Sequence, residues 1–245
     1  MGGLNPWWNL LLKKFRRAAA RLYPIAFHQN QRSNKVKFSY IQLITAFILF
    51  QPAVFSQDLY NRNLLKNNGA EAEKTSPTAG WLNIFKDEVA ATGYGSTGGE
   101  FDTDWGKDKG YGNNYFRAGV QTSEPRYISQ EIDLSSLSGA IDSGIVNFEL
   151  SGSFGGGKGA SSKLEAIFKN KEGRTIGIES TEHVKPGERT TDEPSLYKHT
   201  KSSKVPTGTV TVEIYLRFEF VDICTNCSDV AVADNLSVIL IRKTN

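Results

Sequence analysis

The 245-residue sequence predicts an all-β fold, an antiparallel β-sandwich that follows a basic leader and an apolar segment. Three observations support this prediction. Apolar and polar residues alternate with a period of two from about residue 63 onward. Gly- and Pro-rich breaks separate the alternating segments. No window after residue 58 has a convincing amphipathic helical period. Strands with one apolar face, joined by regular turns, are typical of a sandwich.

The clearest strands are three long alternating segments. They are "IVNFELSGSF" (145–154), "KLEAIFK" (163–169) and "TVTVEIYLRFEF" (209–220). Shorter candidate strands lie at 114–120, 125–134, 174–180 and 194–200. The residues predicted to point into the core are Val146, Phe148, Leu150, Phe154, Leu164, Ala166, Phe168, Val210, Val212, Ile214, Leu216, Phe218 and Phe220.

The last predicted strand, "AVADNLSVIL" (231–240), carries a carboxylate at an unexpected place. Counted at period two, Asp234 shares a face with Val232, Leu236, Val238 and Leu240. A buried, unpaired carboxylate is costly, so it needs a cation, hydrogen-bond donors or a proton. The strand therefore predicts a specific partner for Asp234.

The first 56 residues differ in composition from the remainder. No Asp or Glu occurs before Asp58, whereas eight Lys and Arg residues do. The apolar run that follows Lys37 ends in small residues, which is typical of a secretory signal cleaved after Ser56. We expect domain boundaries at 1–56, a leader with a signal peptide, and 57–245, one sandwich domain of a secreted, extracellular protein. A signal anchor at 38–56 and a mitochondrial presequence are the alternatives.

The predicted mature chain, after the leader, has fewer basic than acidic residues. Removing the eight leader cations from 29 leaves 21 basic residues against 26 acidic ones. Nucleic-acid binding needs clustered Lys and Arg, so no nucleic-acid partner is expected.

Several segments in a fixed order resemble one family. They are "NLLKNNGAEAE" (63–73), Trp81, "YFRAG" (115–119), "SQEIDLSSL" (129–137), "IDSGIVNFELSGSFGG" (141–156), "VPTGT" (205–209) and "ADNLSVIL" (233–240). Together they resemble the secreted galactose-binding-like jelly rolls related to the family-four and family-nine carbohydrate-binding modules. The resemblance covers nearly all of 63–241 and implies a jelly-roll β-sandwich.

The resemblance also implies a partner for Asp234. In such jelly rolls a calcium ion often lies between the first-strand "N-G-x-x-E" segment and the last strand. Mapped onto this sequence, the metal ligands would be Glu71 and Asp234, with Glu73 as the alternative to Glu71 and backbone carbonyls completing the shell. Oxygen ligands of this kind suit Ca²⁺, which would be a structural cofactor. A hydrogen-bonded turn without metal is the competing interpretation.

The only two cysteines, Cys224 and Cys227, lie in "ICTNCS". One C-x-x-C cannot complete a four-ligand zinc site, and no βαβ pattern suggests a redox fold. In a secreted sandwich a disulfide between them is the simplest interpretation. The same region contains two formal glycosylation sequons, at Asn226 and Asn235. The first has Cys inside the motif and the second lies in a strand.

The segment 94–116 is the candidate ligand-binding loop. It is long and Gly-rich and combines aromatic rings with carboxylates and amides, as loops that carry function often do. The candidate ligand-binding residues are Trp105, Tyr111, Tyr115 and Asp104. The competing interpretation is that these aromatics close the sandwich.

The sequence thus favours a secreted, calcium-stabilised, non-catalytic binding module for a glycan or polysaccharide. No enzyme is expected, because no nucleophile–base cluster stands out in the mature chain. An extracellular adhesive or matrix protein making protein contacts is the alternative, and a jelly-roll hydrolase or lyase comes third.

Overall fold

The computed structural model describes residues 59–72, 78–84, 88–97, 99–102, 104–119, 125–156, 159–185, 188, 195–220 and 230–243. The leader, Glu73 and the Cys224–Cys227 pair lie outside these residues, so the predictions about them stay predictions. No helix in the described part of the chain has the length and hydropathy needed to cross a bilayer.

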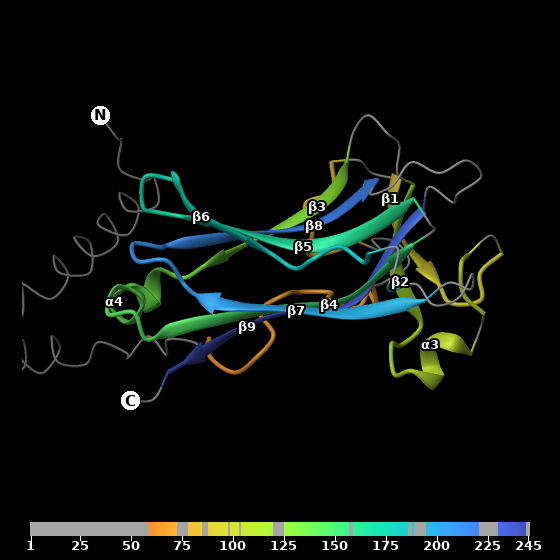
Figure 1. Cartoon of the computed structure of the whole chain (residues 1–245), viewed down its shortest axis with the longest axis horizontal. Coiled ribbons are helices and arrows are strands. Elements are labelled where there is room, and N and C mark those ends of the chain that lie inside the picture. Colours follow the sequence, from red (N-terminus) through yellow and green to blue (C-terminus); the bar gives the residue numbers. More distant parts are fainter. Residues whose placement is uncertain are drawn as a thin grey trace, which may run out of the picture. The chain divides into compact units, whose positions relative to one another are not determined.

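The domain consists of two stacked antiparallel sheets (Figure 1). Sheet A has the strand order β1-β2-β9-β4-β7, and sheet B has the order β3-β8-β5-β6. The strands are β1 (Val89–Gly93), β2 (Asn114–Gly119), β3 (Arg126–Asp133), β4 (Val146–Gly156), β5 (Ala160–Lys169), β6 (Thr175–Ser180), β7 (Leu196–Lys204), β8 (Thr211–Phe220) and β9 (Val230–Arg242). The predicted jelly-roll β-sandwich is confirmed.

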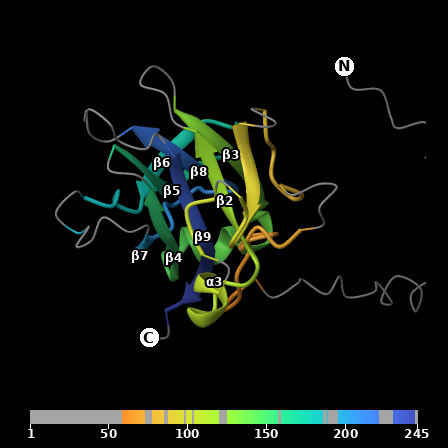
Figure 2. The same cartoon turned by 90° about the vertical axis from the view of Figure 1, so that its right-hand side faces the viewer.

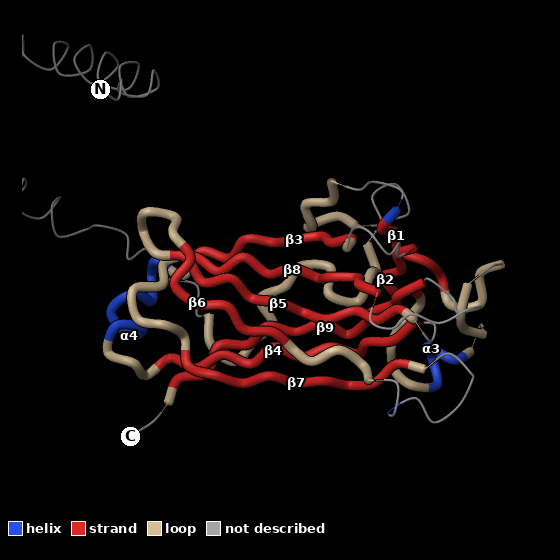
Figure 3. Tube along the Cα trace, turned by 45° about the horizontal axis from the view of Figure 1, so that its top comes forward, coloured by secondary structure: helices blue, strands red, loops and turns tan. Residues whose placement is uncertain are grey.

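Short helical segments lie at the two ends of the sandwich. The helix α3 (Trp105–Asp108) and the helix α4 (Ser138–Asp142) occupy opposite ends, with the strands running between them (Figures 1 and 3). A 3-10 turn at Ser135–Leu137 precedes α4. Because each helix has only one or two turns, neither produces an amphipathic period that the sequence could display.

The main core is formed by apolar residues of both sheets, which face each other in the view along the strands (Figure 2). On β8, Val212, Ile214 and Leu216 are at most 2% exposed. Their register partners on β5 continue the same face, with Leu216 opposite Leu164 and Ile214 opposite Ala166. On β4, Val146, Phe148, Leu150 and Phe154 all belong to the same core cluster. The alternation in these strands therefore predicted the buried face correctly, although Val210 precedes β8 and is only half-buried.

The segment 59–72 runs beside β9 and fixes its position. The Leu64 amide donates to the Val238 carbonyl at 2.9 Å. Asn63 adds two side-chain bonds, from Nδ2 to the Leu236 carbonyl at 2.8 Å and from the Val238 amide to Oδ1 at 3.0 Å. These bonds bring the segment 68–71, "NGAE", beside the middle of β9, where the Leu236 amide donates to the Asn68 carbonyl at 2.9 Å.

Candidate functional site

A β-bulge in β9 turns Asp234 away from the main core. Ser151 of β4 pairs with Ser237, but Ser153 pairs with Asp234, so β9 has one extra residue between these pairs. Asn235 in the bulge has φ of 48°, a left-handed conformation that Asn tolerates better than most residues. An extra residue reverses the faces of the residues before it.

The register shows the result of this reversal. Ala233 lies opposite Phe154 of the core, whereas Val232 lies opposite Gly155 and packs in a second, smaller cluster. Leu236, Val238 and Leu240 stay in the main core. The prediction that Asp234 and Val232 share the core face of those three residues is therefore wrong, because strict period-two counting fails across a bulge.

Five aromatic residues of the 94–115 segment cover the outer face of sheet A at this point. We call them the loop cluster: Tyr94, Phe101, Trp105, Tyr111 and Tyr115. Trp105 stacks on Tyr94 with ring centroids 5.8 Å apart and on Tyr111 at 5.4 Å, and its centroid is 4.4 Å from that of Phe101. The loop cluster thus forms a small second core over β2 and β9.

Gly106 allows this packing. A Cβ at position 106 would lie 2.3 Å from Cδ2 of Tyr94, with two further ring carbons within 2.7 Å. We predict that Gly106→Ala lowers the stability of the domain by about 1–3 kcal/mol, as overpacking usually does. Chemical denaturation would measure the change. Gly139→Ala in α4 is the control, since no heavy atom lies within 4 Å of its added Cβ. Equal stability of the two variants would contradict the close packing of Tyr94.

Asp234 is completely buried beneath the loop cluster. Tyr94 donates its hydroxyl to Oδ2 at 2.7 Å, and the Asn235 amide donates to Oδ1 at 2.6 Å. Burial raises the pKa of Asp234 to about 8, with a contribution from the nearby Glu71 charge, although the two hydrogen bonds act in the opposite direction. Burial and the Asp234 charge likewise raise the pKa of Tyr94.

Glu71 reaches the same place from the 59–72 segment. Its Oε1 accepts the amides of Asn113 at 2.7 Å and Asn114 at 2.8 Å. A Cβ added to Gly69 would lie 3.3 Å from Oδ1 of Asp234 and 3.8 Å from Cγ of Glu71, so both side chains approach Gly69. The structure therefore places the 59–72 segment beside Asp234 of β9. These are the two segments between which the resemblance implies a calcium ion.

The donor set around Gly69 suits a hard cation. Two carboxylates lie near each other, and neither has a Lys or Arg partner among the ion pairs of the described residues. Carboxylate and carbonyl oxygens are the ligands that Ca²⁺ takes. No third His, Cys, Asp or Glu joins them within the described part of the chain, so other ligands would have to be carbonyls or water.

The four predicted ligand residues have different surroundings. Tyr115 is completely buried, and its hydroxyl donates to Glu100 at 3.0 Å and accepts the Glu100 amide at 3.1 Å. Tyr115 therefore belongs to the interior of the loop cluster, where its ring cannot contact a ligand. Trp105 and Tyr111 are half-buried, and Asp104 is exposed. Two parts of this arrangement were missed from the sequence, namely Phe101 as a packing residue and Tyr94 as the partner of Asp234.

A second pair of aromatic rings lies on the outer face of sheet B. Tyr127 and Tyr215 are in edge contact at 5.3 Å, with the Arg217 guanidinium over both rings. Arg217 is also bound to Glu165 at 2.6 Å. This group lies on the other sheet, so substitutions in it can serve as controls for substitutions in the loop cluster.

No family model matches the chain, and no curated protein matches it. Among solved structures, the enzymatically active domain of bacteriophage CBA120 tailspike protein 4 is similar to 73% of this chain at 13% identity, with a TM-score of 0.44. The chain covers only 21% of that protein. The xylan-binding domain CBM22-1 of Paenibacillus barcinonensis Xyn10C matches 72% of this chain and 93% of its own, at 14% identity and a TM-score of 0.40. The mannan-recognising carbohydrate-binding module TmCBM27 matches 67% of this chain and 90% of its own, at 11% identity and a TM-score of 0.29.

Proposed function

We propose that residues 57–245 form a secreted, non-catalytic carbohydrate-binding domain that calcium stabilises. The observation that carries the proposal is the position of Tyr111 in the loop cluster. Its half-buried ring stacks on Trp105 with only 9° between the ring planes, and Trp105 is itself packed on Tyr94. The exposed Asp104 and Asn113 are near neighbours in the chain.

This arrangement has the features that sugar binding needs. A pyranose ring stacks its apolar face on an aromatic ring, and a ring that is already held in place loses little conformational entropy on binding. The neighbouring carboxylate and amide groups can accept and donate hydrogen bonds to hydroxyls. A glycan or polysaccharide is therefore the ligand class that the loop cluster supports best.

Calcium would have a structural role in this domain. Glu71 and Asp234 would hold the ion with backbone carbonyls, and the ion would neutralise the buried carboxylate and fasten the 59–72 segment to β9. Glu71 also holds the amides of Asn113 and Asn114, so the ion would support the ligand loop without contacting the ligand.

Tyr111→Ala tests the ligand surface. We expect it to weaken glycan binding by about 1–3 kcal/mol, the range known for bases on aromatic platforms, with little effect on the melting temperature. Trp105→Ala should weaken binding and also lower the melting temperature, because Trp105 contacts three other rings. A glycan array followed by calorimetry on the bound sugar would measure both effects.

Tyr215→Ala is the matched control, since it removes a half-buried tyrosine from the other sheet. It should bind like the parent protein. If Tyr215→Ala loses binding and Tyr111→Ala keeps it, the ligand surface lies on sheet B. If the parent protein binds nothing on a broad array, the carbohydrate function is wrong.

A further inference from the structure

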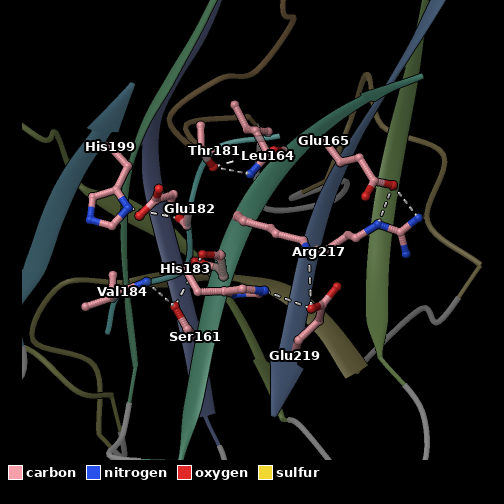
Figure 4. Close-up of polar contacts among 12 residues, drawn as sticks. Ser161, Leu164, Glu165, Thr181, Glu182, His183, Val184, His199, Arg217 and Glu219 are labelled. Carbon is pink, nitrogen blue, oxygen red and sulfur yellow. Dashed lines mark hydrogen bonds and ion pairs between the residues drawn. The ribbon is translucent and has the colours of Figure 1, made fainter. Parts of the chain in front are cut away.

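Residues 181–185 and Glu188 form a strap between the two edge strands β6 and β7. We call these described residues the strap. The Thr181 amide donates to the Leu164 carbonyl at 2.9 Å, and the Leu164 amide donates back to the Thr181 hydroxyl at 3.0 Å. The Val184 amide donates to Oγ of Ser161 at 3.1 Å (Figure 4). The Val184 side chain is completely buried in the main core. The strap thus closes one side of the sandwich.

Two histidines fasten the strap, and His199 of β7 is the more informative. Its Nδ1 lies 2.9 Å from the Glu182 carbonyl oxygen (Figure 4), and its Nε2 lies 3.3 Å from Oε1 of Glu188. A carbonyl and a carboxylate only accept hydrogen bonds, so both ring nitrogens must donate to satisfy both contacts. Only the doubly protonated imidazolium can do this, because neutral imidazole carries one N–H.

His183 acts on the same strap with a different partner. Its Nε2 lies 3.0 Å from Oε2 of Glu219, which also binds Nζ of Lys163 at 3.3 Å. The hydrogen bond from His183, together with the Lys163 charge, lowers the pKa of Glu219 against the effect of burial. One N–H, which neutral imidazole also carries, is enough for the single His183 contact, so this contact depends less on histidine charge than the His199 contacts do.

Charged side chains of both signs lie around the strap and His199. The carboxylates near it are those of Glu182, Glu188 and Glu179, and the cations are Lys185, which pairs with Glu182 at 2.6 Å, and Lys201, which pairs with Glu179 at 3.1 Å. The edge of the Phe154 ring, from β4, packs on the imidazole at 6.3 Å between centroids. The His199 side chain is only 13% exposed, so water can replace a lost contact only in part.

We propose that the strap is a pH-sensitive latch that protonated His199 holds closed and neutral His199 releases. Histidine changes its charge between about pH 5 and 8. Below this range both His199 contacts are satisfied and the strap stays on the edge of the sandwich. Above it neutral imidazole has one N–H for two acceptors, so one contact is lost. Local opening then frees Val184 and the edge of β5 at Ser161 and Leu164, to which the strap is bonded.

Amide hydrogen exchange on the purified protein tests the latch. After correction for the intrinsic pH dependence of exchange, protection of the Thr181 and Val184 amides should fall about threefold to fivefold from about pH 6 to about pH 8.5, because the contact with the partly exposed Glu188 carboxylate contributes no more than a surface ion pair does. The Leu216 amide in the central strand β8 should keep its protection. Unchanged protection at Thr181 and Val184 would overturn the proposal.

Glu188→Gln separates the latch from a merely structural role. Its side chain is 42% exposed, so the fold should survive, and Gln can donate to a neutral Nε2. Protection in this variant should no longer depend on pH. Lys185→Gln removes an exposed ion pair of the same strap and should retain the dependence of the parent protein. A Glu188→Gln variant with the parental pH dependence would overturn the proposal.

Discussion

With calcium removed by a chelator, the domain should lose stability as the pH rises from about 4 to about 8. The cause is Asp234, whose pKa burial raises from 3.8 to about 8. In this interval the folded state holds a proton that the unfolded chain has released, so the free energy of unfolding falls with pH. The contribution is complete below the unfolded pKa and is lost as the pH passes the folded pKa. Its full size is on the order of 5 kcal/mol.

Asp234→Asn isolates this contribution. The amide is almost isosteric with the protonated acid and carries no charge at any pH. Other carboxylates act in the opposite direction, because ion pairs and hydrogen bonds lower the pKa of Glu219 and Asp133 and their stabilisation is lost in acid. The quantity to measure is therefore the difference between parent and variant in urea unfolding at each pH. A difference that stays constant from pH 4 to 8 would show that Asp234 remains ionised in the folded domain.

The strands and the main core could be predicted because their pattern is local. In β8 every second residue from Val212 onward is apolar, and β4 and β5 follow the same alternation except at Gly152 and Ser162. Sheet packing buries that face. The short strand β1, "VAATG", has no such alternation and was not predicted. It exists because β2 offers it a full set of antiparallel partners, which the sequence of β1 alone does not reveal.

The orientation of Asp234 could not be predicted because it depends on one inserted residue. The bulge at Asn235 keeps Leu236 and Val238 in the core while turning Val232 and Asp234 outward. One local signal was present, since Asn is among the residues that adopt positive φ most readily. In an alternating segment, however, that signal competes with the period-two pattern, and only the pairing with β4 decides between them.

The loop cluster presents a similar difficulty. Tyr115 and Phe116 are consecutive residues of β2, both completely buried, yet one packs in the loop cluster and the other in the main core. A strand buried on both faces at one point needs a covering layer, and here Tyr94, Phe101 and Trp105 provide it from a Gly-rich segment. The composition of that segment indicated a ligand-binding role, whereas Tyr94, Phe101 and Tyr115 are buried as a packed layer beside Asp234.

Millimolar calcium should raise the melting temperature by about 10 °C at neutral pH. An ion that binds only the folded state at 100 to 1,000 times its dissociation constant contributes about 3–4 kcal/mol, which corresponds to that shift in a domain of this size. The ion requires ionised Asp234, so it must displace the proton that the apo domain holds below about pH 8. The calcium effect should therefore be larger at pH 8 than at pH 6, opposite to the trend of the apo protein.

Two variants locate the ion. Asp234→Asn should abolish the calcium effect at every pH, because it removes the charge of a ligand that is completely buried. Glu71→Gln should reduce the effect without removing it, since Glu71 is exposed and its carboxylate also holds the Asn113 and Asn114 amides.

Glu149→Gln is the control for these two variants and should respond like the parent protein. Glu149 lies on the outer face of β4, where Ser202 is its partner. Differential scanning calorimetry with calcium and with chelator would measure each shift. If calcium leaves the parent melting curve unchanged at pH 8, the metal assignment is wrong. The burial of Asp234 is then compensated by its hydrogen bonds from Tyr94 and the Asn235 amide and by a bound proton.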